Sequence, residues 1–309
     1  MGRETARARK VLASLEPKWV WERGETLVRV VLFLAAAFAV LVTLAIFLAL
    51  IFDAVAFFEV VNPIDFYTGT VWSPDIREVF GVLPLLAGTL IIAGGACLIG
   101  IPLGLSAAIY LREYAPARVR EVVKPVLEVL AGIPTIVYGL FALLAVAPLL
   151  RVWFGASFFN GANAIIVIGI LIIPLVSSLS EDALTAVPVD LRDGALALGA
   201  TKLEATTRVL LPAALSGVGS SFILAFSRAV GETMIVLIVA GQNTDLTFNI
   251  FGQMTTLAGW AAKRTTGDVA VGETVYLALF AVGFTLFVVT LLLNLASDAL
   301  RARFREAYE

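Results

Sequence analysis

Long apolar runs without a single acidic or basic side chain decide what this chain can fold into. About 20 such residues in a helix cross the roughly 30 Å hydrocarbon core of a bilayer, and these runs lack the polar stripe of a soluble helix. Short alternating segments typical of a β-barrel are not visible either. We therefore predict an all-α integral membrane protein with six spans. The uncharged runs are 30–52, 81–111, 129–150, 162–179 and 274–297, and a sixth run, 216–241, carries only Arg228 and Glu232.

Lysine and arginine gather in alternate connections between these runs. The positive-inside rule places such connections in the cytoplasm, so both termini and the segment 183–212 are predicted to be cytoplasmic. The opposite connections hold only Arg77, Arg151, Lys263 and Arg264. The predicted parts are a cytoplasmic segment 1–29, a first helix with its external loop 30–80, a core 81–300 and a cytoplasmic tail 301–309.

The N-terminal segment is too charged for a secretory signal, and the run 30–52 exceeds the roughly 7–15 residues of a signal's apolar region. We expect the first span to be retained. Residues 5–16 fit either a short basic helix on the anionic leaflet or a disordered basic tail that only sets the topology.

Several residue types are absent, and their absence narrows the chemistry. The chain has no histidine and one cysteine, Cys97, which we predict to be a small packing residue. His-based metal sites and triads are thereby excluded, and no glycine-rich phosphate loop ending in Gly-Lys is present. The remaining classes are a transporter, a channel, a receptor or scaffold, or a membrane enzyme that uses carboxylates alone. We expect no catalytic residues, no metal and no cofactor in this chain.

The segment 183–212 contains two predicted short helices that meet at a glycine. Asp190 is the expected N-cap of the first helix, with Asp193 in capping-box spacing, and Gly199 closes it. Thr201 and Glu204 form a second capping box, and Pro212 follows the end of the second helix. Such an elbow would present a small apolar face to the cytoplasm, formed by Leu191, Ala195 and Leu198.

The same residues resemble the cytoplasmic loop of ABC importer permeases, whose pattern is EAA, three residues, Gly, nine residues, Ile, one residue and Leu-Pro. The chain keeps this spacing but has Asp for Glu, Gly for the first Ala and Val for Ile. In that family the loop inserts into a cleft on the ATP-hydrolysing subunit. The matching residues are Asp193-Gly194-Ala195, Gly199, Val209, Leu211 and Pro212.

Three further stretches, 88–116, 127–141 and 228–234, are similar to the phosphate importer permeases, and nearer to the PstC-type subunit than to its PstA-type partner. The resemblance implies a type I ABC importer permease fold, MetI-like, in a prokaryotic cytoplasmic membrane. The partners that it implies are a PstA-type second permease, PstB-type ATPase subunits that bind ATP and Mg, an external PstS-type phosphate-binding protein and membrane lipids, with no nucleic acid.

Arg228 and Glu232 are predicted to lie four residues apart on one face of the sixth run, where they can pair. An arginine placed mid-span usually faces protein or a water-filled cavity. One interpretation is a structural ion pair. The other is that Arg228 meets an oxyanion on a transport pathway, because the guanidinium fork matches phosphate oxygens. Glu232 would then hold Arg228 between passages, so that the anion is released.

Other residues admit two interpretations as well. Glu128 begins the third run beside Lys124, where it is either half of a solvated pair or, with Pro134, part of a gate. In the external loops 53–80 and 242–273, aromatic residues form either an interfacial belt or part of a dock for an external protein.

Three alternatives to a phosphate importer remain. A sulfate or molybdate permease makes similar demands on arginine. An ATP-independent anion transporter or channel could also bury this residue, although no internal repeat is visible. An enzyme acting on lipid phosphates would need acid and base groups gathered near one membrane surface.

Overall fold

The computed structural model describes residues 18–267 and 272–303. The expectations for segment 5–16 and for most of the tail 301–309 therefore fall outside the described residues. The chain divides into two units, Met1–Phe52 and Asp53–Glu309. Most of α2 (Lys18–Val60) belongs to the first unit, and it contains the helix predicted over 30–52. The helix begins before the apolar run, where Glu25 and Arg29 pair at 3.6 Å with i,i+4 spacing.

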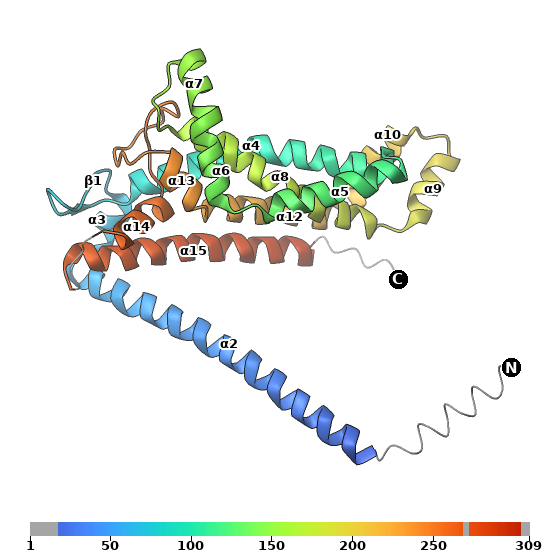
Figure 1. Ribbon diagram of the computed structural model, residues 1–309, viewed down its shortest axis with the longest axis horizontal. Coiled ribbons are helices and arrows are strands. Elements are labelled where there is room, and N and C mark those ends of the chain that lie inside the picture. The colour runs from blue at the N-terminus through green and yellow to red at the C-terminus, as the bar shows by residue number, and fades with distance from the viewer. Residues whose placement is uncertain (1–17, 268–271, 304–309) are drawn as a thin grey trace. The chain divides into compact units, whose positions relative to one another are not determined.

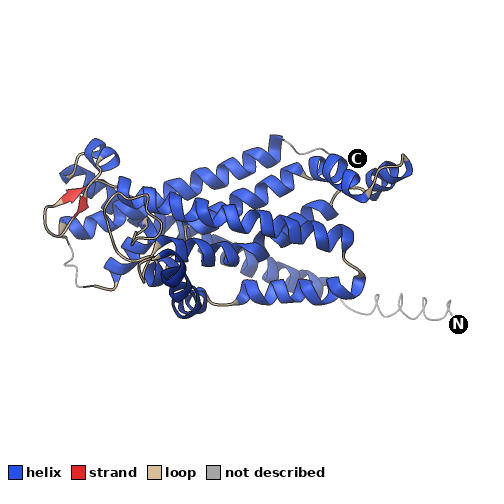
Figure 2. Cartoon of the chain, turned by 90° about the horizontal axis from the view of Figure 1, so that it is seen from above, coloured by secondary structure: helices blue, strands red, loops and turns tan. Residues whose placement is uncertain are grey.

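The second unit is a bundle of long helices with short elements at both ends (Figure 1). The helices α4, α8, α12 and α15 run along one another, and α9 and α10 lie at the end away from α3, α14 and the strands (Figures 1 and 2). The bounds are α3 (Pro63–Thr68), β1 (Trp72–Ser73), β2 (Val79–Phe80), α4 (Leu83–Ile109), η1 (Tyr110–Tyr114), α5 (Ala117–Gly132), α6 (Thr135–Phe141), η2 (Ala142–Val146), α7 (Ala147–Phe154), α8 (Gly161–Thr185), α9 (Val189–Ala197), α10 (Lys202–Ala205), η3 (Thr206–Leu210), α11 (Leu211–Ala213), α12 (Leu215–Val230), α13 (Met234–Val239), α14 (Leu257–Thr265) and α15 (Thr274–Arg303), with η marking π-helical turns.

Within the described residues, five helices are long and apolar enough to cross a membrane: Glu25–Val60, Leu83–Tyr114, Thr135–Phe154, Gly161–Thr185 and Thr274–Leu300. A sixth span results if Lys202–Ala213 and Leu215–Val230, which meet at an angle of 75°, are counted together. The six predicted runs thus correspond to six helical regions, although two of their boundaries were predicted wrongly.

Close contact between α4 and α8 forms the centre of the bundle. A side-chain carbon added to Gly100 would lie 2.3 Å from Ile172 Cγ1 and 2.6 Å from the Gly169 carbonyl. One added to Gly104 would lie 2.7 Å from Val176 Cβ. Small residues at spacing four let two helix backbones approach in this way, and the neighbouring Cys97 is buried as a packing residue.

The third predicted span begins later than the apolar run suggests. Helix α5 ends at Gly132, and Ile133 and Pro134 adopt extended backbone before α6 starts at Thr135. Pro134 has no N–H to donate to the carbonyl of Leu130 four residues earlier. The hydroxyl of Tyr138 donates to that carbonyl instead, at 2.8 Å. The spanning helix is therefore Thr135–Phe154 rather than 129–150, and α5 is a separate helix.

The run 216–241 is also broken. Helix α12 ends at Val230, residues 231–233 are not helical, and α13 covers Met234–Val239. Glycine is a poor helix former, and the carboxylate that follows Gly231 bonds the first N–H groups of α13. The prediction of one continuous helix through Arg228 and Glu232 was wrong.

The aromatic residues of the loops 53–80 and 242–273 form a core rather than a belt. The strands β1 and β2 pair with Trp72 opposite Phe80, and an aromatic cluster is buried beneath them. Trp72 meets Trp260 edge to face with ring centroids 4.8 Å apart. Arg264, which lies in the same helix α14 as Trp260, pairs with Asp75. The belt interpretation is therefore wrong for these buried rings, whereas Phe248 is exposed.

The α4–α8 contact predicts different effects for substitutions at two glycines of the same helix. In Gly100→Ala the added methyl group would overlap the Ile172 side chain and the Gly169 carbonyl. Overpacking of this kind costs about 1–3 kcal/mol of stability. Gly94→Ala meets no atom within 4 Å and should be neutral or slightly stabilising. Thermal unfolding of the purified, detergent-solubilised protein measures both. A melting temperature lowered equally by the two variants would contradict the contact.

Candidate functional site

Arg228 and Glu232 pair across the break between α12 and α13. Arg228 stands in the last turn of α12, and its Nη1 lies 3.7 Å from Glu232 Oε2. The other carboxylate oxygen accepts the backbone N–H groups of Met234 and Ile235, at 3.2 and 3.3 Å. The predicted pairing is confirmed, but Glu232 acts from the start of α13 and not from the same helix.

The two side chains of this pair differ in exposure. The Glu232 side chain is 3% exposed and that of Arg228 is 49% exposed. A buried carboxylate needs several partners: Glu232 accepts hydrogen bonds from two backbone amides and forms an ion pair with one guanidinium. Arg228 has five N–H donors in a fixed fork, so most of them remain free for another acceptor.

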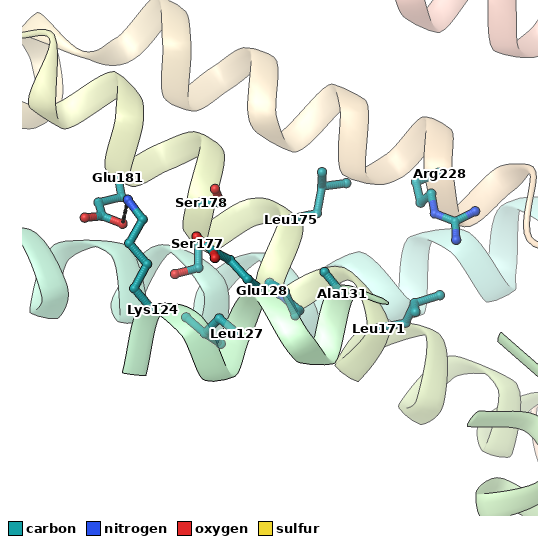
Figure 3. A pocket seen from close by; sticks show the side chains of 11 residues that line it. Lys124, Leu127, Glu128, Ala131, Leu171, Leu175, Ser177, Ser178, Glu181 and Arg228 are labelled. Carbon is teal, nitrogen blue, oxygen red and sulfur yellow. Dashed lines mark ion pairs between the residues drawn. The ribbon is translucent and has the colours of Figure 1, made fainter. Parts of the chain in front are cut away.

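A cavity of about 290 Å³ extends from Arg228 between three helices. Lys124 and Glu128 come from α5, Ser177 and Glu181 from α8, and Arg228 from α12, as Figure 3 shows. Leucine, alanine and proline side chains form the rest of its wall. One water molecule takes roughly 30 Å³ of liquid, so this cavity admits a small ion with part of its water shell.

Lys124 does not pair with Glu128 as the sequence suggested. Its Nζ lies 3.2 Å from Oε2 of Glu181, on α8. Glu128 is exposed and lines the cavity, whereas Pro134 lies outside it, at the break before α6. Only contacts between separate helices bring Lys124 and Glu181 together, so the sequence pattern could not identify the pair.

The segment 183–212 is helical as predicted, with one cap misplaced. Helix α8 continues to Thr185, and Pro188 takes the N-cap position of α9. Asp190 therefore lies in the first turn of α9, and no capping box forms there. An acidic residue in the first turn still interacts favourably with the helix dipole. Pro188 has φ −55° and ψ 134°, so it is not helical itself, and the first turn begins directly after it with Asp190 inside.

The glycine and the second capping box are confirmed. Gly199 has φ +88°, a left-handed conformation that favours glycine. Thr201 N–H donates to Glu204 Oε2 at 2.9 Å, and Glu204 N–H donates to Thr201 Oγ1 at 3.3 Å. The backbone N–H of Thr201, followed by its hydroxyl, holds the pKa of the Glu204 carboxyl below its ordinary value.

The second helix of the segment does not stop before Pro212. A π-helical turn, η3, precedes it, in which Leu211 N–H bonds the carbonyl of Thr206. This wider turn lets the helix pass Pro212, which has no N–H to donate, and continue to Ala213. The chain bends only at Ala214, before α12.

The elbow presents the residues of the matched pattern to solvent. Asp193, Gly194 and Leu198 are exposed, Leu198 to 92%, whereas Ala195 is half-buried. No atom lies within 4 Å of a side-chain carbon added at Gly194. The Leu198 side chain is therefore accessible to another protein.

One further ion pair ties this elbow to the bundle. Glu113, in the π-helical turn η1 that ends α4, is buried and lies 2.9 Å from Arg192 Nε of α9. Arg112 Nε is 3.9 Å from the same carboxylate. Neither residue belongs to a spacing pattern that marks the contact, so the sequence analysis missed it. Across residues 18–267 and 272–303, no group of three His, Cys, Asp or Glu side chains could hold a metal ion.

The chain matches the family model described as binding-protein-dependent transport system inner membrane component over residues 100–306. The phosphate transport system permease protein PstC of Mesorhizobium japonicum is 34% identical over 248 residues, covering 74% of this chain and 75% of that protein. The probable ABC transporter permease protein YqgH of Bacillus subtilis is 34% identical, covering 79% of each chain. A probable PstC of Methanocaldococcus jannaschii is 31% identical, covering 79% and 83%.

Two solved structures share the fold. One is the methionine ABC transporter MetNI in an inward-facing conformation, with a TM-score of 0.54, 22% identity and coverage of 72% of this chain and 94% of that chain. The other is a bacterial alginate ABC transporter in complex with an alginate-bound periplasmic protein. Its TM-score is 0.60 and its identity 16%, with coverage of 86% and 93%.

The capping box predicts how the elbow responds to mutation and acid. Thr201→Ala removes a cap worth about 1 kcal/mol, so amides of 201–213 should exchange roughly fivefold faster by hydrogen–deuterium exchange mass spectrometry. Thr207→Ala is the matched control, because the Thr207 hydroxyl only bonds the Leu203 carbonyl behind it. Since the pKa of Glu204 is lowered in the folded helix, its contribution is complete above the unfolded pKa and is lost as the pH falls through the folded value. Equal exchange in both variants would contradict the capping role.

Proposed function

Because the chain belongs to the family of binding-protein-dependent transport system inner membrane components, we propose that it is the permease subunit of an ATP-driven importer that moves inorganic phosphate across the cytoplasmic membrane. It is a multi-pass membrane protein with the type I ABC importer permease fold. The observation that supports phosphate as the substrate is the half-exposed Arg228, which pairs with a buried carboxylate at the edge of a cavity. The PstC relatives support the same substrate.

The geometry of the pair suits transport better than tight binding. A bare arginine in a mostly apolar cavity would hold a phosphate too firmly for it to leave, and conduction requires a site that the anion leaves easily. Glu232 competes for the guanidinium, and its own position is fixed by the N–H groups of α13. In this proposal the Arg228 guanidinium turns from Glu232 to the anion when the anion arrives. It pairs with Glu232 again when the anion leaves.

The energy comes from other subunits. We propose that ATP and Mg are bound by PstB-type ATPase subunits, that a PstA-type permease completes the pathway, and that a PstS-type protein delivers phosphate from outside. The chain itself then has no enzymatic role. This assignment places α9 and α10 in the cytoplasm with both termini, in agreement with the distribution of lysine and arginine.

The elbow 183–212 is the part that would receive movement from an ATPase. Leu198 and Asp193 face outward for docking, and the Glu113–Arg192 pair links α9 to the end of α4. Because α4 packs against α8 along its glycines, displacement of α9 has a direct path to the helices of the cavity. Glu128 and Pro134 serve as gate residues here, since the break at Pro134 lets α5 move apart from α6.

The central prediction concerns Arg228. In the assembled transporter, Arg228→Gln should lower ATP-driven phosphate uptake at least tenfold, because charge-assisted hydrogen bonds to an anion contribute about 1.5–3 kcal/mol. Arg151→Gln removes a charge from the exposed surface of α7 and should leave uptake unchanged. Sulfate and molybdate as competitors test the neighbouring substrates. If the Arg228→Gln transporter assembles normally and still takes up phosphate at the normal rate, the Arg228–Glu232 pair has only a structural role.

A second prediction concerns docking of the ATPase. Leu198→Asp places a charge on the apolar tip and should prevent co-purification of the ATPase subunit, whereas Leu198→Met keeps an apolar contact of similar volume and should preserve it. Pull-down from detergent-solubilised membranes measures both. Equal recovery of the ATPase with the two variants would show that the tip is not the docking surface.

A further inference from the structure

We propose that Lys124 is a second anion-binding residue of the cavity, at the end opposite Arg228, and that Glu181 is the carboxylate that takes it back when the anion leaves. The inference rests on the proposed function, because it adds a second station to the same pathway. Figure 3 shows Lys124 and Glu181 at one end of the cavity and Arg228 at the other.

The two ends of the cavity are built alike. At each end a partly exposed cation faces a nearly buried carboxylate: the exposed fractions are 49% and 3% for Arg228 and Glu232, and 39% and 8% for Lys124 and Glu181. Full burial of both charges of an ion pair carries a desolvation cost, which their attraction repays only when the remaining hydrogen bonds are satisfied. Here the carboxylate is enclosed and the cation retains donors that reach the cavity.

A buried hydroxyl between the two cations lacks a partner in the protein. Ser177 lines the cavity, is 1% exposed, and its Oγ has no hydrogen bond. Three other buried serines, Ser180, Ser220 and Ser221, are hydrogen-bonded, whereas Ser297 on α15 is also without a partner but does not line the cavity. A buried polar group left without a partner is costly, and an oxyanion in the cavity would accept its proton. Together with Lys124 and Arg228, Ser177 gives a series of donors along a mostly apolar wall.

The charges that face Lys124 explain why such a site would release its ligand. Glu181 is in contact with the ammonium group, and Glu128 lines the same cavity from α5. Two acids thus compete with a bound anion near Lys124, so a small tetrahedral oxyanion would bind there only weakly. Because the Lys124–Glu181 pair joins α5 to α8, an anion that draws Lys124 away also loosens α5, whose far end is the break at Pro134.

The test uses the complete transporter with its partner subunits, reconstituted in liposomes, and inorganic phosphate as the probe. Lys124→Gln should lower maximal ATP-driven uptake roughly tenfold, while the half-saturating external phosphate concentration stays within about twofold, because this end of the cavity meets the anion after entry. Lys124→Arg should restore most of the rate. Ser177→Ala removes a hydroxyl without a protein partner, so it should assemble normally and still slow uptake about threefold.

The double variant Lys124→Gln, Glu181→Gln separates transport from structure. A structural ion pair replaced by two amides would recover normal uptake, whereas the loss of an anion site would not. Arg118→Gln, an exposed charge on the same helix, is the matched control and should behave as wild type. Normal uptake by Lys124→Gln or by the double variant, with Arg228→Gln still impaired, would overturn this inference alone. A wild-type complex that carries no phosphate would overturn the proposed function.

Discussion

Buried carboxylates constrain this structure more than any other group. Glu113, Glu181 and Glu232 are each almost wholly buried, and an ionised carboxylate among apolar helices must find cations or N–H donors. Each holds a cation that stays partly exposed: Arg192, Lys124 and Arg228, respectively. The buried acid fixes the geometry, and the cation remains accessible. Ion pairs that stabilise the packing of the helices can therefore also take part in function.

Breaks in the helices decide where these pairs form. Pro134 cannot donate to the Leu130 carbonyl, so α5 ends and carries Lys124 as a separate helix. Helix α12 ends before Gly231, and Glu232 then accepts the first N–H groups of α13 and pairs with Arg228. In both places a proline or a glycine marks the end of a helix that carries a charge of the cavity, Lys124 on α5 and Arg228 on α12.

Local chemistry made several features predictable. The glycine conformation at Gly199 and the capping box of Thr201 and Glu204 depend on neighbours within three residues, so the sequence predicted them correctly. The prediction of Asp190 as the N-cap was wrong, because Pro188, two residues earlier, occupies the N-cap position. The prediction that the second helix ends before Pro212 was wrong, because a π-helical turn accommodates the missing backbone N–H of this proline. In each failure, a second local rule competed with the one that we applied.

The sequence by itself determined the membrane class, the approximate spans, the two-helix elbow and the pairing of Arg228 with Glu232, because hydropathy, capping and the cost of a charge in lipid act over short stretches of chain. The partners Lys124–Glu181 and Glu113–Arg192, the cavity between α5, α8 and α12, and the unpaired Ser177 hydroxyl depend on the packing of helices far apart in the chain. Only the tertiary structure could decide these, because the attraction between two charges depends on their distance and surroundings in space.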